Sequence, residues 1–97
     1  MIDGLQVNIR TADTFELDAV IGLMQAHADF ERASICTRGL RYRLIQAMRG
    51  APPRLCLLVA EHKRELLGYC ALTREFSSWR GCDYLHLDCL FIVTRAR

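Results

Sequence analysis

The chain has 97 residues, of which 52% are hydrophobic and 25% are charged, and its formal net charge is +2. This composition excludes an intrinsically disordered chain, and the weak positive charge argues against a dedicated nucleic-acid-binding domain. No apolar run reaches the roughly 18 residues of a membrane helix, and the first residues lack the pattern of a secretory signal. We therefore expect residues 1–97 to form a single small domain that resides in the cytoplasm.

The first half of the sequence predicts one strand followed by two helices. Residues 6–10 alternate apolar and polar side chains, as a strand does. Asp13 and Glu16 have capping-box spacing ahead of a helix of about 15 residues, in which apolar positions recur at steps of three and four. Thr37 is placed to cap a second helix over residues 38–48, which ends before a Gly-Ala-Pro-Pro segment.

The second half predicts three strands, over residues 55–60, 66–74 and 84–93. The first and last of these are apolar at nearly every position, which is typical of strands covered on both faces. A charged turn at residues 61–65 joins the first two as a hairpin. The element order β-α-α-β-β-β predicts an α/β domain, α+β in the stricter sense, with two helices and a mainly antiparallel sheet.

The predicted last strand, residues 84–93, has no later element in this sequence to cover it. An apolar edge strand promotes aggregation unless another segment pairs with it or covers it. We therefore expect the chain to be part of a larger unit, or to be completed along this strand by a second copy in a homodimer or by another protein.

The five cysteines show no spacing typical of a disulfide framework or a structural zinc site. Their number is odd, and none forms a C-x-x-C pair, so we expect no bound metal. Four of them lie in or beside apolar stretches, which favours small buried apolar residues in a reducing compartment. The cysteines are Cys36, Cys56, Cys70, Cys82 and Cys89.

Several stretches resemble one known family. Residues 7–12 (VNIRTA) are similar to its opening strand, which commonly ends in Ile-Arg. Residues 57–61 (LLVAE), followed by Leu-Gly-Tyr at 67–69, are similar to its central hairpin. Residues 76–81 (FSSWRG) and 84–92 (YLHLDCLFI) resemble a subgroup that acts on diamines, polyamines and related small amines. The chain thus resembles the N-terminal half of the GNAT N-acetyltransferases, which transfer an acetyl group from acetyl-CoA to an amine.

The resemblance implies acetyl-CoA as co-substrate and a small primary amine as acceptor. Leu90, Phe91 and Ile92 occupy the strand segment whose backbone binds the pantetheine arm in that family. Core packing explains the same three apolar residues, and unpaired backbone amides would distinguish the two. Arg97 falls where the family's pyrophosphate-binding loop begins, and the sequence stops there. Two functions stay open: the amine-side half of an acetyltransferase, inactive and weak in acetyl-CoA binding by itself, or a non-catalytic module that binds a partner through its last strand.

Two residues of the last strand are candidates for catalysis. Amine acetylation needs a base, because an ammonium group has no lone pair. Asp88 is a lone carboxylate on an apolar strand, where burial should raise its pKa toward the working range. It aligns with the family's glutamate, while Cys89 replaces the second acid of that motif. The alternative for Asp88 is an acceptor for loop backbone. His86, two positions earlier on the same face, either relays a proton or packs against its neighbours.

Three further residues fall in segments that border the amine pocket in similar enzymes. Glu31 would attract a cationic amine, and the rings of Phe30 and Trp79 would lie beside it, with Trp79 able to stack on the cation. Surface charge and loop packing explain the same residues without a ligand. The resemblance therefore implies substrate contacts at these three positions.

Overall fold

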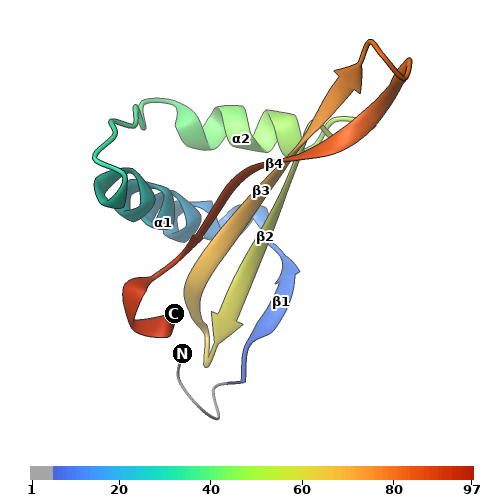
Figure 1. Ribbon diagram of the computed structural model, residues 1–97. Coiled ribbons are helices and arrows are strands. Elements are labelled where there is room, and N and C mark those ends of the chain that lie inside the picture. The colour runs from blue at the N-terminus through green and yellow to red at the C-terminus, as the bar shows by residue number, and fades with distance from the viewer. Residues whose placement is uncertain (1–5) are drawn as a thin grey trace.

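The computed structural model describes residues 6–97, which form a four-stranded sheet with two helices against one face (Figure 1). The sheet order follows the chain, and each neighbouring pair is antiparallel. The predicted element order and fold class are therefore confirmed. The elements are β1 (Asn8–Thr11), a 3-10 turn (Thr14–Glu16), α1 (Leu17–Phe30), α2 (Leu40–Met48), β2 (Leu55–His62), β3 (Glu65–Ser77), β4 (Cys82–Ile92) and a 3-10 turn (Thr94–Ala96).

Arg10 and Glu16 connect β1 to the start of α1. The carboxylate of Glu16 accepts the backbone N–H of Asp13 at 2.6 Å, which is one of the two contacts of the predicted capping box. The guanidinium of Arg10 donates to the same carboxylate at 2.6 and 2.9 Å, and to Glu61 of β2 at 3.2 Å. One arginine thereby links two strands to the helix start.

The start of α2 differs from the prediction. The helix begins at Leu40, and its N-cap is Gly39, whose φ of 66° lies in the left-handed region that favours glycine. Thr37 accepts the N–H of Leu40 through its backbone carbonyl at 3.1 Å. The predicted side-chain cap at Thr37 is therefore wrong, because the chain makes a tight left-handed turn after it.

The hydrophobic core lies between α1 and one face of the sheet. Leu44, Ile45 and Met48 of α2 pack against the edge of this core. Because strand side chains alternate between faces, the odd-numbered residues of β2 and the first half of β3 point toward the helices. The buried cluster comprises Ala12, Leu17, Val20, Leu23, Leu57, Val59, Tyr69, Ala71 and Phe91.

The opposite face of the sheet is apolar and lies open in the described part of the chain. Ile9 is 62% exposed and Leu90 is 59% exposed, and Leu58 and Cys70 are half-buried between them. These four side chains contribute to a shallow groove of about 170 Å³. The prediction that β2 is covered on both faces therefore holds for the helix-facing side alone.

The cysteines are less buried than predicted. Cys36, in the connection between the helices, and Cys82, at the start of β4, are exposed, whereas Cys56, Cys70 and Cys89 are half-buried. All five thiols are free. The interpretation of the cysteines as buried core residues is wrong for the two exposed ones, because turns and edges hold them outside the core.

Leu57 and Leu58 provide a matched test of this core. Leu57 is fully buried against the helices, whereas its neighbour Leu58 lies on the open face. We expect Leu57→Ala to lower the free energy of unfolding by about 2–5 kcal/mol, because it leaves a cavity in a packed core. Leu58→Ala should cost less than half as much. Chemical denaturation of both variants measures the difference, and equal losses would contradict the assignment of the two faces.

The contact of Arg10 with Glu16 predicts a pH dependence of stability. Hydrogen bonding from Arg10 lowers the pKa of Glu16 from its ordinary value of 4.5. The ionised carboxylate therefore stabilises the fold above that value, and this contribution is lost as the pH falls through the lowered pKa. We expect Glu16→Gln to be less stable than the parent at neutral pH, with the difference shrinking below about pH 4.5. Thermal unfolding against pH measures this difference, and Glu75→Gln is the control, because Glu75 is exposed and is not among the partners of Arg10.

Candidate functional site

β4 contains one extra residue, Asp88. Ala71 of β3 pairs with Cys89, and the next β3 residue, Leu72, pairs with Leu87. Asp88 therefore has no partner of its own, which is the arrangement of a β-bulge, and a bulge redirects side chains locally. As a result, Asp88 and Cys89 both line a cavity on the helix-covered side, although they are adjacent in a strand.

The outer edge of β4 carries backbone groups that no other described strand pairs with. Val93 donates its N–H to the carbonyl of Leu67 at 2.8 Å. In an antiparallel ladder, alternate residues direct both backbone groups to the partner strand, so Phe91 also bonds toward β3. The N–H and C=O of Leu90 and Ile92 therefore point to the open edge. The Ile92 carbonyl accepts Nε of Arg97 at 2.7 Å, which leaves the N–H groups of Leu90 and Ile92 and the C=O of Leu90 without a partner among the described strands.

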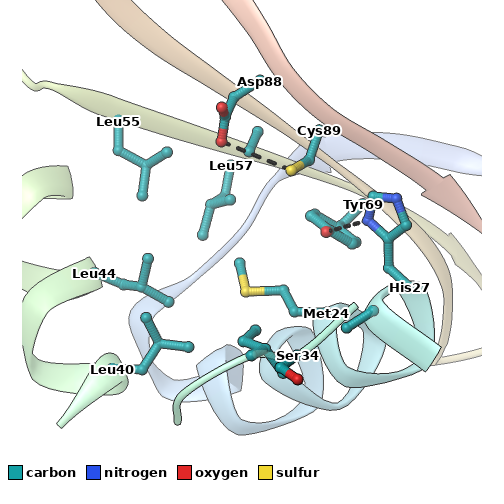
Figure 2. Close-up of a pocket in the computed structure, with 13 residues that line it drawn as sticks. Met24, His27, Ser34, Leu40, Leu44, Leu55, Leu57, Tyr69, Asp88 and Cys89 are labelled. Carbon is teal, nitrogen blue, oxygen red and sulfur yellow. Dashed lines mark hydrogen bonds between the residues drawn. The ribbon is translucent and has the colours of Figure 1, made fainter. Parts of the chain in front are cut away.

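A cavity of about 350 Å³ lies between the two helices and the sheet. Its lining is mostly apolar, with polar groups at one end. Leucine side chains occupy one side and Tyr69 and His27 the other, and the carboxylate of Asp88 points into the space between them (Figure 2). The lining residues are Met24, His27, Ala28, Ser34, Ile35, Leu40, Leu44, Leu55, Leu57, Tyr69, Ala71, Asp88 and Cys89.

The polar end of the cavity is a chain of interacting side chains. The Cys89 thiol donates to the Asp88 carboxylate, with Sγ and Oδ2 3.7 Å apart. The Tyr69 hydroxyl lies 2.7 Å from Nδ1 of His27, and Cys89 is near enough to this hydroxyl to raise its pKa. Nε2 of His27 is 3.5 Å from the exposed carboxylate of Glu31. These contacts connect the cavity to the protein surface.

Burial determines the protonation of two groups in this chain. Burial raises the pKa of the Cys89 thiol, and the nearby negative charge of Asp88 raises it further. Burial also raises the pKa of the Tyr69 hydroxyl, with Cys89 and Asp88 acting in the same direction. Both groups therefore stay protonated at neutral pH, which makes them hydrogen-bond donors rather than nucleophiles.

A second cavity, of about 240 Å³, lies beside the edge of β4. The His27 ring, which also lines the first cavity, stacks on Phe91 with the ring centroids 5.0 Å apart. The guanidinium carbon of Arg97 lies 4.4 Å from the centroid of the Phe30 ring, and its Nε donates to the Ile92 carbonyl at 2.7 Å. The cavity thus brings six of the predicted site residues together. It is lined by His27, Phe30, Glu31, Leu90, Phe91, Ile92 and Arg97.

Three other predicted site residues are placed differently from the expectation. Asp88 is exposed, so the predicted burial of this carboxylate is wrong; the bulge holds it at the rim of the cavity. His86 pairs with Thr73 on the far side of the bulge and is not a lining residue of the cavity. Trp79 is 97% exposed on the turn between β3 and β4, which projects beyond the helices (Figure 1), apart from Phe30 and Glu31.

The sequence analysis missed His27 and Tyr69. His27 follows Met24 by three positions, so it falls on the apolar stripe of α1, and a histidine there is a signal for a polar site within a core. Tyr69 is 42 positions away in sequence. Their contact follows from the packing of α1 on β3, which no local pattern reveals.

No protein-family model and no curated protein matches this sequence. Solved structures do match. A possible acetyltransferase from Clostridium difficile has 16% identity and a TM-score of 0.74, with 94% of this chain and 60% of that chain covered. A predicted acetyltransferase with acetyl-CoA from Clostridium acetobutylicum has 14% identity, coverage of 95% and 63%, and a TM-score of 0.72. A GNAT family acetyltransferase from Staphylococcus aureus has 14% identity, coverage of 96% and 67%, and a TM-score of 0.68.

The chain has a GNAT-like fold. The first two matches have sequence identities of 16% and 22%. Identities this low support a shared fold and do not establish a shared activity. The chain spans about 60% of the length of these first matches. The GNAT-like arrangement therefore accounts for the two helices and the antiparallel sheet, and the activity of a whole enzyme belongs to the proposals below.

The sequence predicts neither a membrane-spanning helix nor a bound metal ion in residues 6–97. No helix in this range combines the length and the apolar character that crossing a bilayer requires. Within the same range, no group of three or more histidine, cysteine, aspartate or glutamate side chains is arranged to hold a metal ion.

The contact between Cys89 and Asp88 predicts the order in which the thiols react. Iodoacetamide attacks thiolates, so the exposed Cys36 and Cys82 should be alkylated before Cys89 at pH about 7.5. Asp88→Asn removes a charge that raises the pKa of Cys89, and we expect alkylation of Cys89 to become several-fold faster. Mass spectrometry of peptides measures each rate. Asp83→Asn, on the same strand, is the control, and an unchanged Cys89 rate in Asp88→Asn would contradict the contact.

Proposed function

We propose that this chain provides the amine-side half of an N-acetyltransferase, which transfers the acetyl group of acetyl-CoA to a small primary amine. The bulge at Asp88 is the observation that carries the proposal. It places a carboxylate at the rim of an apolar cavity, next to the strand edge where Leu90 and Ile92 expose backbone groups. The GNAT-like fold supports the same reaction class.

In the proposed reaction, Asp88 accepts the proton that the amine must lose before it attacks. Exposure of Asp88 on the cavity side leaves it accessible to a cationic amine. The thioester of acetyl-CoA supplies the acetyl group. The N–H groups of Leu90 and Ile92 and the C=O of Leu90 are suited to the amides of an extended pantetheine arm, because such groups add a ligand to a sheet edge as a strand would be added.

Asp88 is exposed at the rim, so a proton that it accepts can pass directly to water, and the neighbouring polar side chains offer a second path. The contacts from Cys89 through Tyr69 and His27 to Glu31 lead away from the cavity, and every group along them can exchange a proton. We assign these residues a supporting role, since they contact Asp88 directly or through one another.

A second candidate function is a non-catalytic module that dimerises or binds a protein through β4. The exposure of this strand favours it, because Leu85 is 68% and Leu87 is 52% exposed beside the open edge. A strand from a partner would cover these groups and occupy the unpaired amides. Sedimentation at high concentration tests this candidate, and a clean monomer would contradict dimerisation.

We place either activity in the cytoplasm. All five cysteines are free, including the two exposed ones, which fits a reducing compartment.

Asp88→Asn tests the acetyltransferase directly. In an assembly in which a partner or further chain completes the sheet along β4, release of the CoA thiol from acetyl-CoA with a primary amine should fall by at least about a hundredfold in the variant, because the amine loses its base. Asp83→Asn should keep the parental rate, since its ion pair with Arg74 is exposed. Calorimetry should give weak acetyl-CoA binding to the chain by itself. Equal rates in the two variants would refute the role of Asp88, and submicromolar binding would refute the expected weakness.

A further inference from the structure

We infer that the amine accepted in the larger cavity carries a single positive charge on an apolar body, as an arylalkyl or branched alkyl monoamine does. This inference rests on the proposed function and narrows its substrate class. The sequence resembles a subgroup that acts on diamines and polyamines, and the composition of the cavity points to a different acceptor.

The charge of the cavity lining is the first argument. Among its described lining residues, Asp88 is the one carboxylate. Glu31, the next carboxylate along the polar chain, lies behind His27 and lines the second cavity instead. A polyamine would therefore bring two or more ammonium groups to one carboxylate, and each uncompensated charge that leaves water is costly.

The position of the apolar residues is the second argument. Leu40 and Leu44 of α2 and Leu55 of β2 lie across the cavity from Tyr69 and His27 (Figure 2). An amine whose ammonium group meets Asp88 at the rim must direct the rest of its body onto this leucine side or into solvent. Burial of an apolar body there is favourable, at roughly 25 cal/mol per Å² of apolar surface removed from water.

The size of the cavity is consistent with such a ligand. At about 350 Å³, the cavity falls in the lower part of the range for small-molecule sites, roughly 300–1,000 Å³. The residues that line it come from both helices, from the connection between them and from three strands. This volume suits a compact amine of one or two rings rather than a long oligosaccharide.

The experiment compares amines by binding, without acetyl-CoA. We expect 2-phenylethylamine to bind the wild-type chain at least about tenfold more tightly than putrescine or spermidine, as measured by NMR titration at neutral pH. Asp88→Asn should abolish this binding, because it removes the counter-ion. Chemical-shift changes should include residues of α2 and Tyr69.

A carboxylate added to the apolar side provides a second test of the amine preference. Leu44→Glu adds a second carboxylate to the apolar side, and it should weaken 2-phenylethylamine and strengthen putrescine. Leu85→Glu, on the exposed part of β4, is the matched control and should leave the preference unchanged. If Leu44→Glu does not fold, the ranking of amines on the wild-type chain decides the question.

The outcomes separate this inference from the proposed function. Tighter binding of putrescine or spermidine to the wild type would overturn the inference and leave the acetyltransferase standing. A preference for 2-phenylethylamine, without acetyl transfer even in an assembly that completes the sheet along β4, would support the ligand class and count against the transfer reaction. Absence of binding by any of the three amines would overturn both.

Discussion

The single inserted residue of β4 determines the chemistry of the site. Without the bulge, strict alternation would send Asp88 and Cys89 to opposite faces of the sheet. With the bulge, both residues line the cavity between the helices and the sheet, where the thiol of Cys89 donates to the carboxylate of Asp88. The same strand stays at the edge of the described sheet, so a carboxylate and unpaired backbone groups lie within a few residues of each other. The accessible carboxylate and the open backbone groups are thus two properties of one irregular strand.

Much of the fold follows from local patterns. Alternation in the strands, the three- and four-residue steps of α1 and the turn residues between them predict the element order correctly. The boundaries differ where tight turns intervene, at residues 14–16 and at Gly39. Residue preferences predict the position of a helix to within about one turn. They do not predict the left-handed and 3-10 residues at its ends, because those conformations depend on how the chain folds back onto the rest of the structure.

The site is predicted less well, for physical reasons. The alternation of side chains along a strand predicts which face each residue occupies, but it does not reveal an inserted residue. It therefore predicts that Asp88 is buried and that His86 lies on the same face, and the bulge makes both predictions wrong. The contact of His27 with Tyr69 joins segments 42 residues apart. The family resemblance predicts that Trp79 lies near Phe30 and Glu31. In the structure, Trp79 lies at the tip of the long β3–β4 hairpin, away from α1 (Figure 1). Sequence patterns thus identify candidate functional residues, whereas tertiary packing determines which of them lie close together.

The imidazole of His27 lines both cavities and stacks on the ring of Phe91. Among the lining residues of the two cavities, His27 is the one that both share. A substitution at His27 would therefore alter the leucine-lined space and the space beside Arg97 at once. The shapes of the two cavities thus depend together on the position of a single side chain.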